Sequence, residues 1–166
     1  MTLRVHTSNP EEAVEAAFFR IQQTRMVDVP IINPALQVQA VDFQRWQGHW
    51  LGMVVTPWCM SMTLVAGCAK DWSSVGINKR RFINFPAGDF AFLGGEEEEL
   101  GEYQSCSLFS PMEMFTTQSQ AVMTARASLI GLLSPPSSPA ATGTPSAVKK
   151  VPVVSRRRFL SMQKPG

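Results

Sequence analysis

Residues 50–65 read WLGMVVTPWCMSMTLV, with two apolar runs on either side of Pro57 and Trp58. Both runs are short and rich in β-branched and bulky apolar residues, which is the composition of β-strands. Proline has no backbone N–H to donate to a strand ladder, so the Pro57-Trp58 pair marks a connection between two strands. We therefore predict neighbouring strands at Trp50–Thr56 and at Met60–Val65.

Further strands are predicted on both sides of this pair. Alternating apolar residues over 36–40, followed by Phe43, precede a turn near Gln47 and Gly48. On the C-terminal side, the Pro86-Ala87-Gly88 sequence suits a tight turn between two more strands. These strands and the one after them are predicted at residues 81–85, 89–93 and 102–109.

Amphipathic helices are predicted at both ends of the strand region. Asn9 can cap a helix that begins at Pro10, and Thr117 with Gln120 fits a capping box at the start of a second helix. The order of helix, strands and helix favours an α+β domain over residues 1–133. We expect an antiparallel sheet of five to six strands, with the N-terminal and the C-terminal helix packed on one face.

The charge of the chain is divided unevenly. Residues 1–133 hold 9 Lys and Arg against 13 Asp and Glu, whereas residues 134–166 hold six basic residues and no acid. A nucleic-acid-binding domain would carry its basic charge on the folded surface, so we expect no nucleic-acid partner. The Pro- and Ser-rich start of the basic segment predicts a disordered tail over 134–166.

Few residues of the sequence are suited to catalysis. A nucleophile needs a base beside it, and His6 and His49 are the two histidines of the chain. His6 precedes the first predicted helix and His49 lies at a strand edge next to Gly48, positions typical of surface residues. No phosphate-binding glycine loop is present, because Gly94-Gly95 leads into acidic residues. We therefore expect a protein that is not an enzyme and needs no cofactor.

Cys59, Cys68 and Cys106 leave two interpretations open. They contain no C-x-x-C pair and are most simply buried thiols that act as small apolar residues, so no metal site is expected. The alternative is a thiol redox or metal-transfer function. The N-terminus lacks an apolar signal segment, and no run is long enough to span a membrane, so we expect a cytoplasmic location without membrane insertion.

Flexible or flat apolar residues gather at the predicted strand ends, next to prolines. Unbranched thioethers and aromatic rings suit a surface that adapts to a partner. We predict an apolar partner-binding rim formed by Trp58, Met60, Phe109, Met112 and Met114. The acidic run, expected to form an exposed loop, adds a charged part to this site with Glu96, Glu97, Glu98 and Glu99.

Three segments carry a resemblance to a known family. They read LGMVVTPWCM at 51–60, FPAGDFAF at 85–92 and YQSCSLFSPMEMF at 103–115. In this order and spacing they resemble the NiFe-hydrogenase assembly chaperones of the HybE/HupJ type. The resemblance covers about residues 10–133. Many relatives end in a rubredoxin module with two C-x-x-C pairs, which this sequence lacks, so iron binding is not expected.

The resemblance implies a function in hydrogenase maturation. Members of the family are thought to hold the hydrogenase small-subunit precursor, or its complex with the large subunit, before twin-arginine export. The C-terminal SRRRFL sequence at 155–160 matches the twin-arginine pattern although it stands at the wrong end for a signal. We predict that this segment mimics the client signal peptide and competes with it for the glutamate run and the apolar rim.

Overall fold

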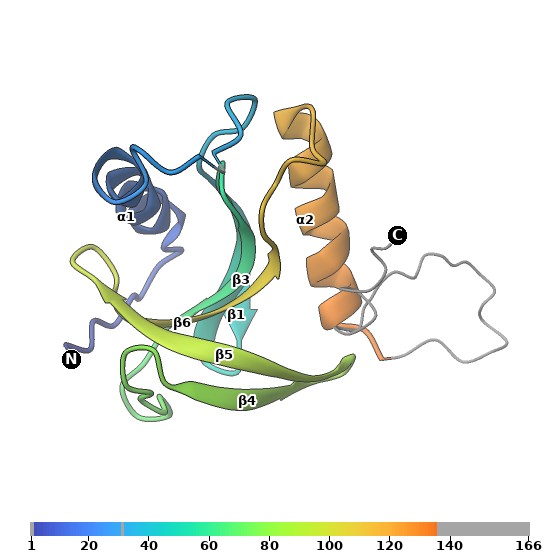
Figure 1. The fold of residues 1–166 in the computed structure, drawn as a ribbon. Helices are drawn as coiled ribbons and strands as arrows, with labels where there is room; N and C mark the ends of the chain where they lie inside the picture. Colours follow the sequence, from blue (N-terminus) through green and yellow to red (C-terminus); the bar gives the residue numbers. More distant parts are fainter. Residues whose placement is uncertain (1, 31, 136–166) are drawn as a thin grey trace, which may run out of the picture. The chain divides into compact units, whose positions relative to one another are not determined.

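A computed structural model describes residues 2–30 and 32–135, and residues 1–134 form one compact unit. Its elements follow the predicted order of helix, six strands and helix (Figure 1). They are α1 (Glu11–Thr24), β1 (Gln39–Trp46), β2 (His49–Val55), β3 (Met60–Val65), β4 (Arg80–Phe85), β5 (Gly88–Glu97), β6 (Gly101–Phe109) and α2 (Gln118–Leu132).

The six strands form one sheet in the order β1-β2-β3-β6-β5-β4, with every neighbouring pair antiparallel. The predicted α+β class and strand number are therefore confirmed. Both predicted turns are also present. Gln47 and Gly48 have φ values of 50° and 83° between β1 and β2, and Gly88 has a φ of 138° after Pro86 and Ala87. Positive φ explains the glycine at each turn.

The second helix start agrees with its predicted cap at Thr117, whereas the first is shifted by one residue, because α1 begins at Glu11 and its N-cap position is Pro10 instead of Asn9. The Asn9 side chain accepts a hydrogen bond from the Glu11 amide at 3.0 Å, and the Thr117 hydroxyl accepts one from the Gln120 amide at 3.1 Å. The Gln120 side chain does not close the capping box on Thr117. It instead accepts from the Thr116 amide at 2.7 Å, one residue further from the helix.

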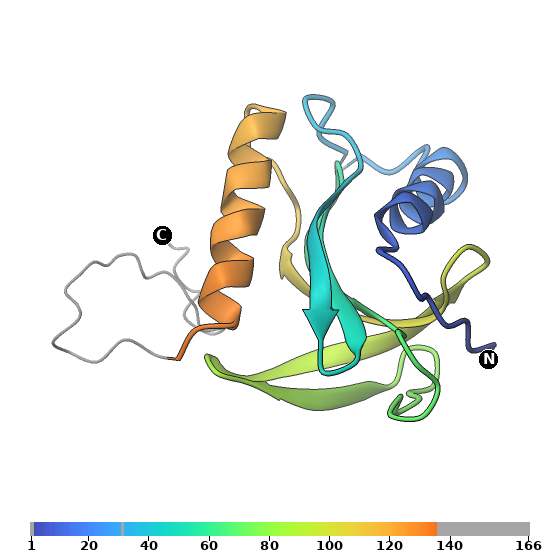
Figure 2. The same cartoon turned by 180° about the vertical axis from the view of Figure 1, so that it is seen from behind.

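The expectation that both helices pack on one face of the sheet is wrong. Buried side chains of α1, such as Val14 and Phe18, form a core with Trp50 and Val54 of β2. Buried side chains of α2 form a second core, with Leu51, Met53 and Val55 of the same strand. Because successive residues of a strand point to opposite faces, the helices cover opposite sides of the sheet (Figures 1 and 2).

The burial of the central strands explains this arrangement. All seven residues of β2 and all six of β3 are buried. A strand covered on both faces has a nearly continuous apolar run in place of the alternation of a half-exposed strand. The run WLGMVV therefore already carried the signal for a second covering layer. No helix of the described residues is long and apolar enough to cross a membrane.

Candidate partner-binding site

The predicted rim residues do meet at one end of the sheet. Met60, which begins β3, is the strand partner of Phe109, which ends β6. The hydroxyl of Ser110 donates a hydrogen bond to the Trp58 carbonyl at 3.4 Å. The turn between β2 and β3 and the segment after β6 therefore lie side by side, although about 50 residues separate them in sequence.

The turn that carries Trp58 is held in place by the hydroxyl of Thr56. This oxygen accepts hydrogen bonds from the amides of Trp58 and Cys59 at 3.2 and 2.9 Å and donates to the Cys59 carbonyl at 2.9 Å. A serine or threonine that bonds the backbone two or three residues later fixes a tight turn. The Trp58 backbone is thus fixed before any partner binds.

The segment after β6 is held by Asn33, which lies in the connection between α1 and β1. Its side-chain nitrogen donates to the carbonyls of Met112 and Phe115 at 3.0 and 2.8 Å. The rings of Phe109 and Phe115 pack edge to face with 5.6 Å between their centres. Three segments from distant parts of the chain therefore converge at this end of the sheet.

Burial separates the five predicted apolar residues into two kinds. Met60 and Met112 have no exposed surface, so they are core residues and their predicted contact with a partner is wrong for this folded structure. Met114 is 55% exposed, and Trp58 and Phe109 are half-buried. Trp58 packs against the core under α1, whereas Phe109 packs against the core under α2. We use the name Trp58 rim for Trp58, Phe109, Pro111 and Met114.

The glutamate run is bound to the rest of the fold, contrary to its predicted exposure. Glu97 is only 8% exposed and pairs with Arg20 at 3.0 Å and Arg25 at 2.7 Å, both from the α1 region. Arg20 also donates two hydrogen bonds to the Glu99 carboxylate, at 2.9 and 2.8 Å. These hydrogen bonds from the Arg20 guanidinium hold the pKa of Glu99 below its usual value.

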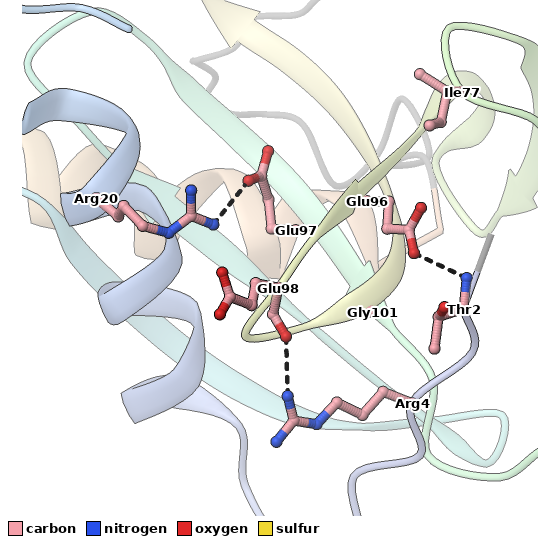
Figure 3. A pocket seen from close by; sticks show the side chains of 8 residues that line it. All are labelled: Thr2, Arg4, Arg20, Ile77, Glu96, Glu97, Glu98 and Gly101. Atoms are coloured by element: carbon pink, nitrogen blue, oxygen red, sulfur yellow. Dashed lines mark hydrogen bonds and ion pairs between the residues drawn. The ribbon is translucent and has the colours of Figure 1, made fainter. Parts of the chain in front are cut away.

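The N-terminal segment covers the other side of the same loop. Figure 3 shows the Thr2 amide pointing to the Glu96 carboxylate and the Arg4 guanidinium pointing to the Glu98 carbonyl. These bonds are 2.8 and 2.9 Å long and border a shallow hollow of about 470 Å³. Of the four glutamates, Glu98 is exposed, Glu96 and Glu99 are half-buried, and Glu97 is buried.

The two parts of the predicted site lie at opposite ends of one strand. β6 begins at Gly101 beside the glutamate loop and ends at Phe109 on the Trp58 rim. Nine strand residues span about 25 Å, so a single short peptide segment does not contact both regions at once. The structure therefore divides the predicted site into an apolar rim and a separate, internally paired acidic loop.

The three cysteines are half-buried. Burial raises the pKa of the Cys59 thiol, and its hydrogen bond with Thr56 offsets only part of that effect. A raised pKa leaves less of the reactive thiolate at neutral pH. Within the described residues, no group of three His, Cys, Asp or Glu residues is placed to hold a metal ion. Residues 155–160, with the predicted signal-peptide mimic, lie outside the described residues.

Sequence reasoning missed four residues that organise these two regions: Arg20, Arg25, Asn33 and Thr56. Two of them have a local signal, because Thr56 lies two residues before Trp58 and Asn33 precedes a proline, positions typical of turn-forming side chains. The two arginines follow three glutamates of α1, and nothing in the sequence indicates which acids they meet across the fold.

Comparison with known proteins assigns the family. The model for the NiFe-hydrogenase assembly chaperone HybE matches residues 9–162. The chain belongs to the HybE family. The HybE solution structure from Escherichia coli aligns with a TM-score of 0.66 and 26% identity, covering 94% of this chain and 95% of that one. The fold and the family resemblance seen in the three sequence segments are thus confirmed.

Other HybE-family relatives differ in length. A hydrogenase expression/formation protein HupJ from Bradyrhizobium diazoefficiens is 40% identical over 124 residues, which is 75% of this chain and 72% of that protein. A probable rubredoxin HupJ from Rhodobacter capsulatus is 38% identical over 120 residues. The match covers 72% of this chain but only 43% of the Rhodobacter protein.

Proposed function

We propose that this chain is a non-catalytic cytoplasmic chaperone that binds the hydrogenase small-subunit precursor, alone or with the large subunit, before its twin-arginine export. The observation that carries this proposal is the HybE-family match over residues 9–162. It is supported by the Trp58 rim, which offers apolar side chains on a backbone already fixed by Thr56 and Asn33. A preformed surface loses less conformational entropy when it binds.

Trp58 is the central contact of the proposed site. Large aromatic side chains dominate the energy of many protein interfaces and cost about 2 kcal/mol or more when truncated there. Trp58 is half-buried against the α1 core, so it is anchored by that core and keeps some accessible surface. Met114, which is 55% exposed, adds a flexible neighbour that adjusts to the client.

The test is co-purification of the tagged chain with the small-subunit precursor, made with and without its signal peptide. We expect enrichment of the precursor and its loss in Trp58→Ala. Phe19→Ala is the matched control, because Phe19 is 56% exposed on α1 and lies outside the rim. Thermal melting of both variants separates lost binding from lost folding. Failure of the unmodified chain to enrich either form of the precursor contradicts the proposal.

Replacing Cys59, Cys68 and Cys106 with serine tests the thiol redox alternative. The proposed chaperone function predicts that hydrogenase activity survives in cells that carry the triple variant. A redox or metal-transfer function requires a reactive thiolate. If hydrogenase activity is lost although the variant is folded and present at normal levels, the redox or metal-transfer function replaces the proposal.

A further inference from the structure

The two edge strands of the sheet, β1 and β4, differ in whether their outer backbone groups are hydrogen-bonded. At the β1 edge, carboxylates of α1 bind the outer amides: Glu15 accepts from Ala40 at 2.9 Å and Glu11 accepts from Phe43 at 3.0 Å. The Asn9 side chain also donates to the Phe43 carbonyl at 3.2 Å. The β1 edge is therefore closed to a further strand, as natural sheets commonly require.

The outer edge of β4 has no comparable cover among the described residues. A two-residue turn joins β4 to β5 and places Phe85 opposite Gly88. Hydrogen-bonded pairs occur at every second residue of an antiparallel ladder, and the Gly94 amide donates to the Lys79 carbonyl at 2.8 Å. The residues of β4 that lie between these hydrogen-bonded positions direct their backbone amides and carbonyls away from β5. These outward backbone groups belong to Arg80, Phe82 and Asn84.

A groove borders β4 on the face of the sheet that packs under α2. Its volume is about 570 Å³, and one wall is formed by residues 81–84 of β4. The facing wall comes from the end of the β1–β2 hairpin, with Trp46, Gln47 and His49. Trp46 stacks on Phe85 with 4.7 Å between ring centres, which ties the two walls together. The His49 ring is fixed by the Gly67 amide and the Asp71 carbonyl, so that wall is rigid.

The side chains of β4 indicate what kind of segment fits beside it. Phe82 is 69% exposed, the largest exposed fraction among the exposed large apolar side chains of the described residues. It follows Lys79, Arg80 and Arg81, and none of these cations forms an ion pair with another described residue. Arg81 donates instead to the neutral side chain of Gln104 at 3.0 Å. The three cations outnumber the two nearby acids, Asp71 in the groove and Asp89 beside Asn84, so the local charge around β4 is positive.

We propose that the outer edge of β4 binds an extended, acidic segment of a partner protein, which adds to the sheet as a seventh strand. The outward backbone groups supply hydrogen bonds that are independent of side chains, while Phe82 and the three cations favour a segment that carries both apolar and acidic residues. This surface is distinct from the Trp58 rim, because the seven residues of β2 run from the groove at His49 to the other end of the sheet.

A second copy of the chain fits this edge less well than an acidic segment. Neither β4 nor the Lys79 before it supplies an acid, so pairing β4 with the β4 of another copy leaves the cations of both copies without an opposite charge. Lysine and arginine at a sheet edge commonly discourage such self-pairing. The same charges attract a segment rich in aspartate or glutamate.

The test uses a short fluorescein-labelled peptide of alternating valine and glutamate, with binding to the full chain followed by fluorescence anisotropy at low salt. We expect saturable binding that weakens as salt is added. A peptide of the same sequence with N-methyl groups on alternate amides keeps the side chains but cannot form the ladder. We expect it to bind about tenfold more weakly or worse. A lysine–valine peptide should not bind.

Two pairs of variants locate the site. Arg80→Glu should weaken binding of the acidic peptide about fivefold or more, whereas Arg126→Glu, a charge reversal on α2, should not. Phe82→Ser should also weaken it, and Phe19→Ser on α1 should not. Hydrogen exchange gives a direct signal, because the Arg80, Phe82 and Asn84 amides should exchange more slowly once the peptide is bound.

Several results would overturn the proposal. Strand addition at β4 is ruled out if the acidic peptide does not bind, if the N-methylated peptide binds equally well, or if Arg80→Glu leaves the affinity unchanged. Analytical ultracentrifugation tests whether a second copy of the chain binds this edge instead. A dimer that Phe82→Ser converts to a monomer assigns the edge to a second copy and rejects the acidic segment.

Discussion

The Trp58 rim and the glutamate loop lie at opposite ends of β6, and the fold uses them in opposite ways. At the rim, buried side chains and backbone hydrogen bonds hold a turn in place while Trp58 and Met114 keep exposed surface. At the loop, the acidic groups are bound by Arg20, Arg25 and the N-terminal segment, and Glu97 is nearly buried. The rim keeps exposed apolar surface, whereas the loop joins parts of its own domain.

This difference shows why residue type alone does not identify a binding surface. Methionines next to a turn and a run of glutamates both suggest contact with a partner. Packing of the segment after β6 decides that Met112 lies in the core while Met114 stays exposed, and the position of α1 decides which glutamates are neutralised. Four experiments test this contrast.

The first prediction compares two methionines two residues apart at the rim. Met112→Ala leaves a cavity in the core under α2 and should lower the free energy of unfolding by about 2–5 kcal/mol. Met114→Ala removes a mostly exposed side chain and should change it by less than about 0.5 kcal/mol. Urea unfolding measures both values. Similar losses of stability in the two variants would contradict the difference in burial between Met112 and Met114.

The second prediction compares two glutamates of the loop. Glu97→Gln removes the charge that Arg20 and Arg25 share and should cost about 1–2 kcal/mol of unfolding free energy, between the values of surface and buried pairs because both arginines are partly exposed. Glu98→Gln is the matched control, since its side chain is exposed, and should change stability by less than about 0.5 kcal/mol. Equal effects would mean that the loop is solvated after all.

The third prediction uses Tyr103, the single tyrosine of the chain, as a probe between the two regions. Burial, followed by the negative charge of Glu97, raises its pKa to about 12. In the unfolded chain the pKa is about 10, so the unfolded state loses this proton first and stability should fall as the pH rises from 10 to 12. Below pH 10 the group is protonated in both states and its contribution is fully present.

The near-ultraviolet absorbance of tyrosinate follows this titration directly. Glu97→Gln should lower the midpoint, because it removes a charge that disfavours the tyrosinate. Glu98→Gln again serves as the control. A midpoint near the unfolded value in the folded protein, as shown by circular dichroism at the same pH, would contradict the burial of Tyr103.

The smallest expected effect concerns Cys59 at the rim turn. Because burial raises the pKa of its thiol, alkylation by iodoacetamide at mildly alkaline pH should be slower in the folded chain than in the chain unfolded by urea. Mass spectrometry of the digested protein assigns the rate to each cysteine. A faster reaction in the folded protein would indicate an activated thiol and would return the redox alternative to consideration.

Much of the fold was predictable from local patterns. The strand runs at 50–55 and 60–65, the turns at Gly48 and Gly88, and the cap at Thr117 all depend on interactions within a few residues. The two faces of the sheet were not predicted. They follow from which residues of β2 meet which helix, a contact between elements that lie far apart in sequence.

The candidate site was predictable only in part. Proline-marked strand ends correctly brought Trp58 and Phe109 to one end of the sheet, because β3 and β6 are neighbours. The placement of Met60 and Met112 in the core, and the pairing of the glutamates with α1, depend on packing that no local pattern shows.

The elements, the antiparallel α+β class and the likeness to the HybE family could be read from the amino-acid sequence, because propensity, turn chemistry and motifs depend on residues close together in the chain. Packing between distant segments placed α1 and α2 on opposite faces, paired Arg20 and Arg25 with Glu97, and closed the β1 edge while leaving the β4 edge uncovered by the described residues. These outcomes depend on burial and on charge pairs between segments tens of residues apart, and such interactions form only when the chain is packed.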